Sequence, residues 1–155
     1  MRLQLLTVGK PKQKALAEAG ADYFKRLARY CKIEEHTVRE ERAGKGIRSS
    51  DVIRKEGERV LSSISPSAYV VILDRGGKAV ASEQLAEKVA KLAERSIEVV
   101  FVIGGALGLS PDVIKRANWR WSLSAQTYPH ELARVMVLEQ LYRAHTLLRG
   151  EPYHK

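Results

Sequence analysis

The sequence predicts one α/β domain with a mostly parallel sheet and helices on both of its faces. Apolar runs suited to strands alternate with segments whose apolar residues recur at helical spacing. The run YVVILD (Tyr69–Asp74) is apolar almost throughout, as central strands of parallel sheets tend to be. The chain has 155 residues, of which 45% are hydrophobic, so it is long enough for a real core and is unlike a disordered chain. We therefore expect a single domain over residues 1–155.

The first half of the chain contains two expected strands and two expected helices. In order, they are a strand at Leu3–Val8, a helix from about Gln13 to Tyr30, a strand at Ile33–Val38 and a helix capped by Ser50. The first helix carries Leu16, Tyr23, Leu27 and Tyr30 on one face, and the second carries Ile53, Val60, Leu61 and Ile64. The polar and basic stretch between them, REERAGKGIRSS, is expected to be a mobile loop.

The second half continues the same alternation. After the strand at Tyr69–Asp74, the expected elements are a helix that starts at Ser82, a strand at Ile97–Gly104, a short helix near Pro111–Ala117, a strand at Trp119–Ser124 and a helix from about His130 to Leu148. No internal repeat or low-complexity tract interrupts them. This order is typical of successive β-α-β units.

The last expected helix has an unusually wide apolar surface. One broad sector holds Ala133, Met136, Val137, Leu141, Ala144, Leu147 and Leu148, and a second holds Val135, Leu138 and Tyr142. A surface wider than one stripe indicates burial on two sides. One side is expected to meet the sheet and the other a second subunit, although burial within one domain is the alternative.

The charge balance favours a polyanionic partner. The formal net charge is +9 and the isoelectric point is near 9.8, with 15 Lys and Arg against 9 Asp and Glu in residues 1–60. Such a field attracts nucleic acid, but a merely basic soluble surface explains charge alone equally well. We find no signal peptide or apolar run long enough to span a bilayer, and the single cysteine, Cys31, fits a reducing cytoplasm.

The stretch IGGALGLSP, from Ile103 to Pro111, places three glycines after an apolar strand and before a possible helix start. Glycines in this setting let a backbone come close to a phosphate, another ligand or another piece of chain. The spacing does not match the P-loop, and it does not match the G-x-G-x-x-G dinucleotide fingerprint. The turn therefore favours a ligand at the sheet edge without specifying phosphate.

Other common chemistries find little support. His36, His130, His145 and His154 lack metal-ligand spacing, so no metal is expected, and Ser122 and Ser124 lack the G-x-S-x-G nucleophile motif. Two stretches remain unexplained. They are the hydroxyl-rich SLSAQTYPHELARV, which leads into the last helix, and the terminal EPYHK, for which a frayed tail is the ordinary reading.

Taken together, VIGGALGLS, WSLSAQTYPHELARVMVLEQLYRAHTLLRGEPYHK and the opening LQLLTVGK resemble one family. It is the RlmH-type (YbeA-like) ribosomal RNA methyltransferases of the SPOUT superfamily. The resemblance spans the whole chain, and differences fall in the basic loop around Arg39–Ser50 and at the Ala106-Leu107 pair. Members methylate N3 of a pseudouridine in 23S ribosomal RNA with S-adenosylmethionine. They act as homodimers on assembled ribosomes, so a cytoplasmic protein is implied.

The resemblance also implies a fold and a set of site residues. SPOUT enzymes tie a C-terminal trefoil knot, which is expected here in about residues 70–155 together with the cofactor site, against the strong preference for unknotted chains. By similarity, the cofactor-binding residues are Leu73, Gly104, Leu123, Ser124, Ala125, Gln126, Thr127 and Tyr128. Leu73 and Leu123 would hold the adenine ring between them, and the glycine turn would bond its edge.

Three residues are expected to be catalytic: Arg143, Tyr153 and His154. Arg143 would stabilise a uracil oxygen or grip phosphate, and the terminal pair would close over the base by stacking or by taking the N3 proton. Our hypothesis is that the tail completes the partner's site across the dimer. His130 lies beside the cofactor loop, where packing or capping at the helix start is an equal alternative to catalysis.

With no separate RNA-binding module, RNA contact is assigned to basic residues of the N-terminal half. They are Lys10, Lys12, Arg39, Arg42, Lys45 and Arg48. Two rival functions remain open from the residues alone. One is a nicotinamide-dependent oxidoreductase that uses the glycine turn, although it lacks a ribose-binding acid at the expected distance. The other is a non-catalytic ribosome-binding factor, which would leave the terminal Tyr-His pair without a role.

Overall fold

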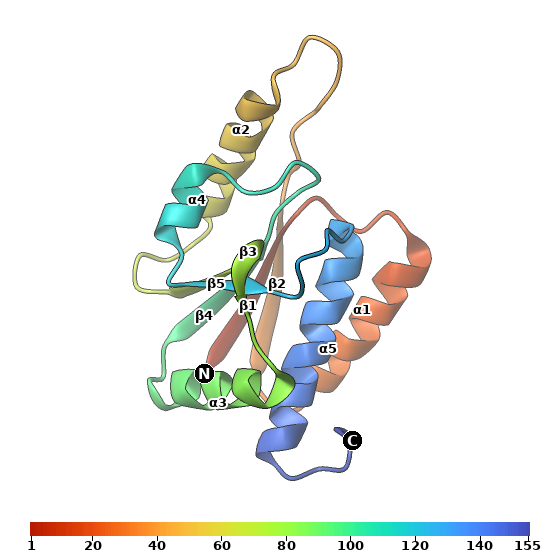
Figure 1. Cartoon of the computed structure of the whole chain (residues 1–155), viewed down its shortest axis with the longest axis vertical. Helices are drawn as coiled ribbons and strands as arrows, with labels where there is room; N and C mark the ends of the chain where they lie inside the picture. The colour runs from red at the N-terminus through yellow and green to blue at the C-terminus, as the bar shows by residue number, and fades with distance from the viewer.

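The computed structural model describes all residues from 1 to 155, and its five strands form one fully parallel sheet in the order β2-β1-β4-β3-β5 (Figure 1). The strands are β1 (Arg2–Val8), β2 (Lys32–Val38), β3 (Tyr69–Ala79), β4 (Glu98–Ile103) and β5 (Trp119–Ser122). The predicted α/β class with a parallel sheet is confirmed.

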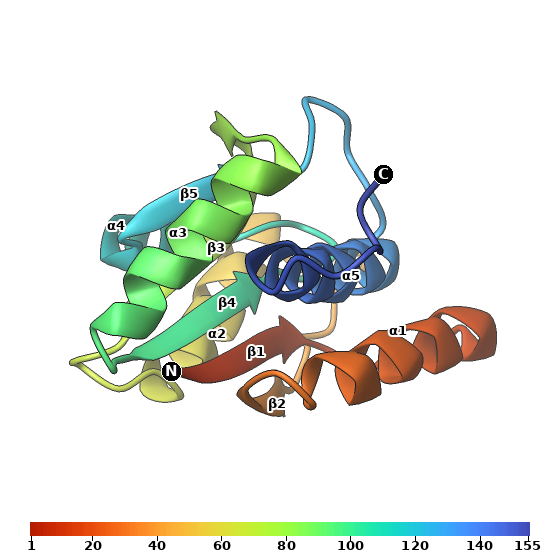
Figure 2. The same cartoon turned by 90° about the horizontal axis from the view of Figure 1, so that it is seen from below.

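Helices cover both faces of the sheet, as predicted (Figure 2). One face carries α1 (Lys14–Leu27), α3 (Ser82–Glu94) and α5 (His130–Leu148), and the other carries α2 (Ser49–Ser62) and α4 (Pro111–Arg116). Side chains of β1 alternate between the two faces of the sheet and so contribute to both cores. Leu3 and Leu5 pack under the first set of helices, while Leu6 and Val8 pack under the second. None of the helices is both long and apolar enough to cross a lipid bilayer.

Several element boundaries differ from the prediction. The expectation that Ser50 caps the second helix was wrong, because α2 begins at Ser49 and Arg48 holds the cap position without a side-chain bond. Helix α1 ends at Leu27, short of Tyr30. Strand β3 runs beyond Asp74 to Ala79, with an irregular register against β5 between Leu73 and Lys78. Strand β5 stops at Ser122, which lengthens the loop that leads into α5.

The buried face of α2 also differs from the expected one. Val52, Glu56 and Val60 point inward at successive turns, whereas Ile53, predicted to belong to the apolar face, is only half-buried. A glutamate therefore occupies a core position on this helix, although the sequence analysis did not place it on the buried face. Glu56 is only 5% exposed.

Because every strand pair is parallel, the carboxyl ends of the strands lie along one edge of the sheet. The segments after β1, β2, β4 and β5 therefore gather there, and ligands of open α/β sheets bind outside this edge. The trefoil knot stays a prediction, since strand order and pairing do not define whether the chain threads its own loop. The edge itself carries the candidate site.

Candidate cofactor pocket and C-terminal cluster

A pocket of about 800 Å³ opens at the carboxyl edge of the sheet. Its walls come from the middle of β3, the glycine turn after β4, the loop after β5 and the start of α5. The lining residues are Leu73, Asp74, Arg75, Ile103, Gly104, Gly105, Ala106, Leu107, Gly108, Leu109, Ile114, Leu123, Ser124, Gln126, Thr127, Tyr128, Pro129, His130 and Ala133. The size falls in the ordinary range for a small-molecule site.

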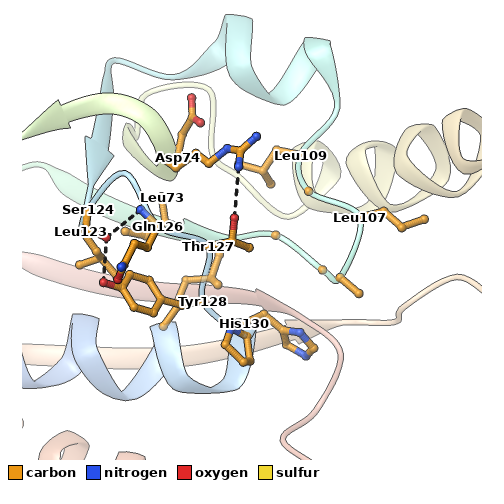
Figure 3. A pocket seen from close by; sticks show the side chains of 18 of the residues that line it. Leu73, Asp74, Leu107, Leu109, Leu123, Ser124, Gln126, Thr127, Tyr128 and His130 are labelled. Atoms are coloured by element: carbon orange, nitrogen blue, oxygen red, sulfur yellow. Dashed lines mark hydrogen bonds between the residues drawn. The ribbon is translucent and has the colours of Figure 1, made fainter.

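The structure brings the residues assigned to the cofactor into this pocket, with one difference. Leu73, Gly104, Leu123, Ser124, Gln126, Thr127 and Tyr128 all line it. Ala125 lies in the same loop but is exposed and does not line the cavity. Leu73 and Leu123 enter from different segments, as a pair that encloses a flat ring requires (Figure 3).

The glycine turn is built from close contacts within its own loop. A Cβ on Gly104 would lie 2.9 Å from Leu109 Cδ2 and 3.2 Å from the Gly108 carbonyl carbon, so no larger residue fits without movement. Gly108 has a φ of +92°, a conformation that glycine adopts without strain. Ser110 then caps α4 through a bond from the Val113 N–H, as the Ser-Pro pair predicted. The glycines thus let the turn fold back tightly and expose its backbone to the pocket.

Hydroxyl groups hold the loop after β5 in shape (Figure 3). The Ser124 and Tyr128 hydroxyl oxygens lie 2.8 Å apart, and the Gln126 N–H donates to Ser124 Oγ over 3.0 Å. The buried Ser122 hydroxyl has the Ser124 and Arg75 carbonyl oxygens as acceptors. These serines are engaged in loop structure, which agrees with the expectation that none is a nucleophile.

Asp74 and Arg75 belong to the pocket, although the sequence analysis assigned neither to it. The Arg75 guanidinium donates to Thr127 Oγ1 over 3.2 Å, which joins the middle of β3 to the loop after β5. Burial alone would raise the pKa of Asp74, but bonds from Arg120 and the Gly76 N–H hold that pKa below its usual value. The pocket wall therefore carries an ionised carboxylate that Arg120 already balances. The only feature of the sequence that could have predicted Asp74 and Arg75 as pocket residues is their position directly after Leu73.

His130 is the first residue of α5 and lines the pocket. Pro129 holds the cap position without a side-chain bond, so the capping role that the sequence left open does not apply. His130 thus faces a ligand site from the helix start, beside Tyr128 and Pro129.

The three residues expected to be catalytic form a separate cluster at the far end of α5. The Arg143 guanidinium pairs with Glu139 and lies 4.7 Å from the centre of the Tyr153 ring. The Tyr153 hydroxyl donates to Glu139 over 3.0 Å, and the Tyr153 ring packs edge-on against Tyr142. The terminal segment is therefore docked rather than frayed. Glu139, which organises the cluster, was missed because an i, i+4 Glu–Arg pair is ordinary on any helix.

The hydrogen bonds of His154 define its tautomer. Arg143 Nη1 lies 3.3 Å from Nδ1, and a guanidinium can only donate, so Nδ1 must carry the lone pair. Nε2 then bears the proton and donates to Glu83 Oε1 over 3.0 Å, although this pair lies largely at the surface. In this arrangement His154 is held between two charged residues of opposite sign.

Tyr153 is held in its protonated form. Burial, together with hydrogen bonds to Tyr23 and Glu139, raises the pKa of Tyr153 far above that of a free tyrosine. A phenol in this state donates hydrogen bonds and does not take up a proton at neutral pH. Of the terminal pair, His154 is thus the one suited to proton transfer.

The pocket lies at the start of α5 and the cluster beside its later turns, and Figure 1 shows the C-terminus next to that far end of the helix. His130 and Arg143 are separated by 13 residues of continuous helix, so their backbones are about 20 Å apart at 1.5 Å per residue. The structure does not bring the tail of a chain to the pocket of the same chain.

The basic residues assigned to RNA lie on the segments after β1 and β2, at the same edge as the pocket. Arg42 and Lys45 are exposed and make no ion pair, whereas Lys12 pairs with Glu40 over 2.7 Å and Arg48 with Asp51 over 3.1 Å. Two of the six assigned residues are therefore balanced within the chain, while Lys10 and Arg39, together with Arg42 and Lys45 at the tip of the loop, carry free charge.

Comparison with known proteins identifies the family. The family described as "Predicted SPOUT methyltransferase" matches residues 1–154. The chain belongs to the SPOUT methyltransferase family. Proteins named "Ribosomal RNA large subunit methyltransferase H" are 46% identical in Bacillus pumilus, 45% in Clostridium acetobutylicum and 42% in Carboxydothermus hydrogenoformans, each over the full length of both chains. The suspected resemblance is confirmed.

Solved structures share the SPOUT methyltransferase fold. A probable methylase family protein from Haemophilus influenzae Rd KW20 aligns with a TM-score of 0.56 at 14% identity, over 99% of this chain and 70% of that one. A protein of Legionella pneumophila described as a methyltransferase, solved in complex with the cofactor SAM, aligns with a TM-score of 0.53 at 13% identity, over 93% of this chain and 66% of that one. At such identities the likeness concerns the fold alone.

No group of three or more His, Cys, Asp or Glu side chains in residues 1–155 is placed to hold a metal ion. Cys31, the single cysteine, is half-buried, and burial raises its pKa to about 11. A thiol with such a pKa stays protonated at neutral pH and is a poor nucleophile.

Proposed function

We propose that this protein is an S-adenosylmethionine-dependent methyltransferase that methylates N3 of a pseudouridine in 23S ribosomal RNA of assembled ribosomes. One observation carries the proposal: residues assigned to the cofactor from three segments converge on one pocket of a SPOUT methyltransferase. Family relatives named for methylation of large-subunit ribosomal RNA support the substrate class.

The pocket residues fit the proposed cofactor. Leu73 and Leu123 offer apolar contacts for the adenine ring, and the turn at Gly104 offers backbone groups to its edge. The walls lack a phosphate-binding motif, which suits a cofactor without phosphate. Ser124, Gln126 and Thr127 are locked by hydrogen bonds within the chain, so the loop is preorganised and little ordering is needed on binding.

The cofactor supplies a methyl group on a sulfonium; the sulfur–carbon bond breaks to leave a neutral thioether, and a nitrogen–carbon bond forms at N3. The in-line geometry requires positioning above all. The N3 proton must go to an acceptor, and His154 Nδ1 has the lone pair for it once its contact with Arg143 is exchanged for substrate. Arg143 would then donate to the uracil oxygen on which charge develops.

The tail acts across a homodimer in this proposal. A separation of about 20 Å along α5, at 1.5 Å per residue, keeps the tail away from the pocket of the same chain and supports action on a partner's pocket. Helix α5 packs on α1 and α3, yet Leu132, Val135 and Met136 remain half-buried and Leu148 is 47% exposed. This apolar remainder supports a two-fold interface through α5. Removing residues 153–155 should abolish methylation and leave cofactor binding and dimerisation intact.

The proposed function is tested by incorporation of labelled methyl groups. Intact ribosomes and free 23S RNA, both from cells that lack this modification, are incubated with the protein and labelled S-adenosylmethionine. We expect incorporation into ribosomes at one nucleotide, which mass spectrometry of nuclease fragments identifies as N3-methylpseudouridine. Ribosomes that carry uridine at that position serve as the matched control. Binding to ribosomes without incorporation would replace the proposal with a non-catalytic binding factor.

A further inference from the structure

Glu56 is a buried carboxylate that the proposed chemistry does not use. It lies on α2, is 5% exposed and points toward the sheet edge. Its Oε1 accepts a hydrogen bond from the Glu41 N–H over 3.0 Å, while Oε2 is buried without a hydrogen-bond partner. An unpartnered buried oxygen of this kind costs free energy, and an apolar residue would suit the position better for stability alone.

The free oxygen of Glu56 faces the glycine turn. A Cβ on Gly105 would lie 2.9 Å from Oε2 and 3.4 Å from Oε1, so the turn and the carboxylate are packed with no space for a methyl group. The next residue of α2 repeats the close approach, because a Cβ on Gly57 would lie 2.2 Å from Ser110 Oγ. Helix α2 therefore supports both ends of the segment 104–110, which forms one wall of the pocket.

The other oxygen of Glu56 holds the start of the basic loop, defined here as residues 39–48. The Glu41 backbone is fixed by Oε1, and the Glu41 side chain pairs with Arg59 of the same helix. Arg59 also donates to the Arg39 carbonyl over 2.9 Å. One side chain thus contacts the loop that carries the proposed RNA-binding charge and the turn that lines the cofactor pocket.

We propose that Glu56 is a positioning residue that couples the basic loop to the glycine turn, so that RNA on the loop and cofactor in the pocket alter each other's affinity. The inference rests on the proposed function for the identity of the two ligands. Oε1 accepts from the loop while Oε2 packs against the turn without a hydrogen bond, so one carboxylate contacts both segments at once. Coupling of this kind is reciprocal, and each ligand changes the affinity of the other by the same factor.

Two substitutions separate the coupling role from a merely structural one. Glu56→Gln keeps the size and one oxygen to accept from the Glu41 N–H, but its second terminal atom is an NH2 group, so the turn faces a donor in place of the free Oε2. Glu56→Ala removes both contacts. Glu58→Gln, which removes an exposed charge from the same helix, is the matched control. Hydrogen exchange of the amides in β1 and β4 reports whether each variant keeps its core.

The measurements are amide hydrogen exchange and calorimetric titration with S-adenosylhomocysteine, the stable product. In the unchanged protein and in Glu58→Gln, the ligand should slow exchange in residues 104–110 and in residues 39–43. In Glu56→Gln it should protect only the turn, and in Glu56→Ala its affinity should fall about 10-fold, within the usual range of coupling between sites. Protection of both segments in Glu56→Gln would overturn the proposal, as would protection of the turn alone in the unchanged protein.

Hydrogen exchange of the proteins without ligand tests the role of Glu56 independently of the proposed function. If S-adenosylhomocysteine does not bind the unchanged protein, the cofactor assignment fails, yet the link between loop and turn is still measurable. In Glu56→Ala, the Glu41 amide and the amides of residues 104–110 should then exchange faster than in the unchanged protein. The amides of β1 and β4 should keep their protection. Equal exchange in Glu56→Ala and Glu58→Gln would refute the link itself.

Discussion

The hydroxyl of Tyr153 donates a hydrogen bond to Glu139 Oε1 across 3.0 Å, and this contact ties the end of the chain to the side of α5. The same carboxylate pairs with Arg143, which in turn faces the His154 ring. Glu139 therefore holds both Arg143 and Tyr153, while Tyr23 and Glu83 contact the tail from α1 and α3. The tail is presented as a rigid group, which is what a site completed by a second copy of the chain requires.

Replacing Glu139 by alanine should release this segment. Arg143 would lose its partner and Tyr153 its acceptor, so the tail residues would no longer be held in place. We expect methylation to fall about 10²-fold, because displacement by about 1 Å has effects of that size. Cofactor affinity, measured by titration, should stay unchanged. Glu87→Ala on α3, an exposed site, is the control, and a rate unaffected by Glu139→Ala would show that tail docking is not needed.

Adding a methyl group at Gly104 should weaken cofactor binding. Its Cβ would lie 2.9 Å from Leu109 Cδ2 and 3.2 Å from the backbone of Gly108, so the turn must shift away from its position at the pocket. For Gly104→Ala we expect an affinity about 10-fold lower, or about 1.4 kcal/mol. Gly44→Ala is matched in chemistry, because nothing lies within 4 Å of that Cβ. Equal affinities for the two variants would mean that the turn does not shape the site.

The periodicity of the chain was enough to predict the order and type of the elements. Apolar runs such as Tyr69–Asp74 are typical of central strands, and the spacing around Val89 is typical of a helix. What the pattern could not supply was the face of α2, because Glu56 occupies a position that stability alone would give to an apolar side chain. The end of β3 was also missed, because the apolar run stops at Asp74 while the strand continues through Gly76 and Gly77 to Ala79.

The site could be predicted only where a family resemblance was available. The glycines alone indicated a ligand near backbone, and nothing in their spacing named it. The distance between the pocket and the tail is a property of the folded helix α5, so the sequence could not show that one chain fails to join them. Glu83 and Tyr23 reach the tail from distant segments, and no local pattern marks them.

The protein should lose stability in mild acid through His145. Burial, then the nearby charge of Arg149, lowers the pKa of His145 below its ordinary 6.5, and Nε2 has no partner. The unfolded chain therefore binds a proton at higher pH than the fold does, so stability is full above about pH 6.5 and falls as the pH drops through the folded pKa. Melting curves recorded between pH 5 and 7.5 should show that the melting temperature of His145→Gln changes less with pH than that of the unchanged protein. If the melting temperatures of both proteins changed equally with pH, His145 would not be the cause of the loss of stability in acid.

Ribosome binding should weaken with salt through the tip of the basic loop. Arg42 and Lys45 are exposed and carry no ion pair, so contact with phosphate would release counterions. For Arg42→Gln with Lys45→Gln, the slope of log affinity against log salt should become shallower by about 2, close to one per contact. Lys91→Gln with Arg95→Gln, at the far end of α3, should leave the slope unchanged. Equal slopes for the two double variants would show that the tip of the basic loop does not contact RNA.

Mixed dimers provide the sharpest test of the tail. A chain that lacks residues 153–155 keeps its pocket, and a Gly104→Val chain keeps its tail, so each should be inactive when paired with itself. If the tail acts on the partner's pocket, the mixed dimer joins one intact pocket to one intact tail. We then expect about half the activity of the unchanged dimer, because one of two equivalent sites is complete. Differently tagged chains, co-expressed and purified through both tags, supply this species. Inactivity of the mixed dimer, with both chains folded and dimeric, would place the tail's action within its own chain, and the length of α5 would then require a large movement of the segment after Arg149.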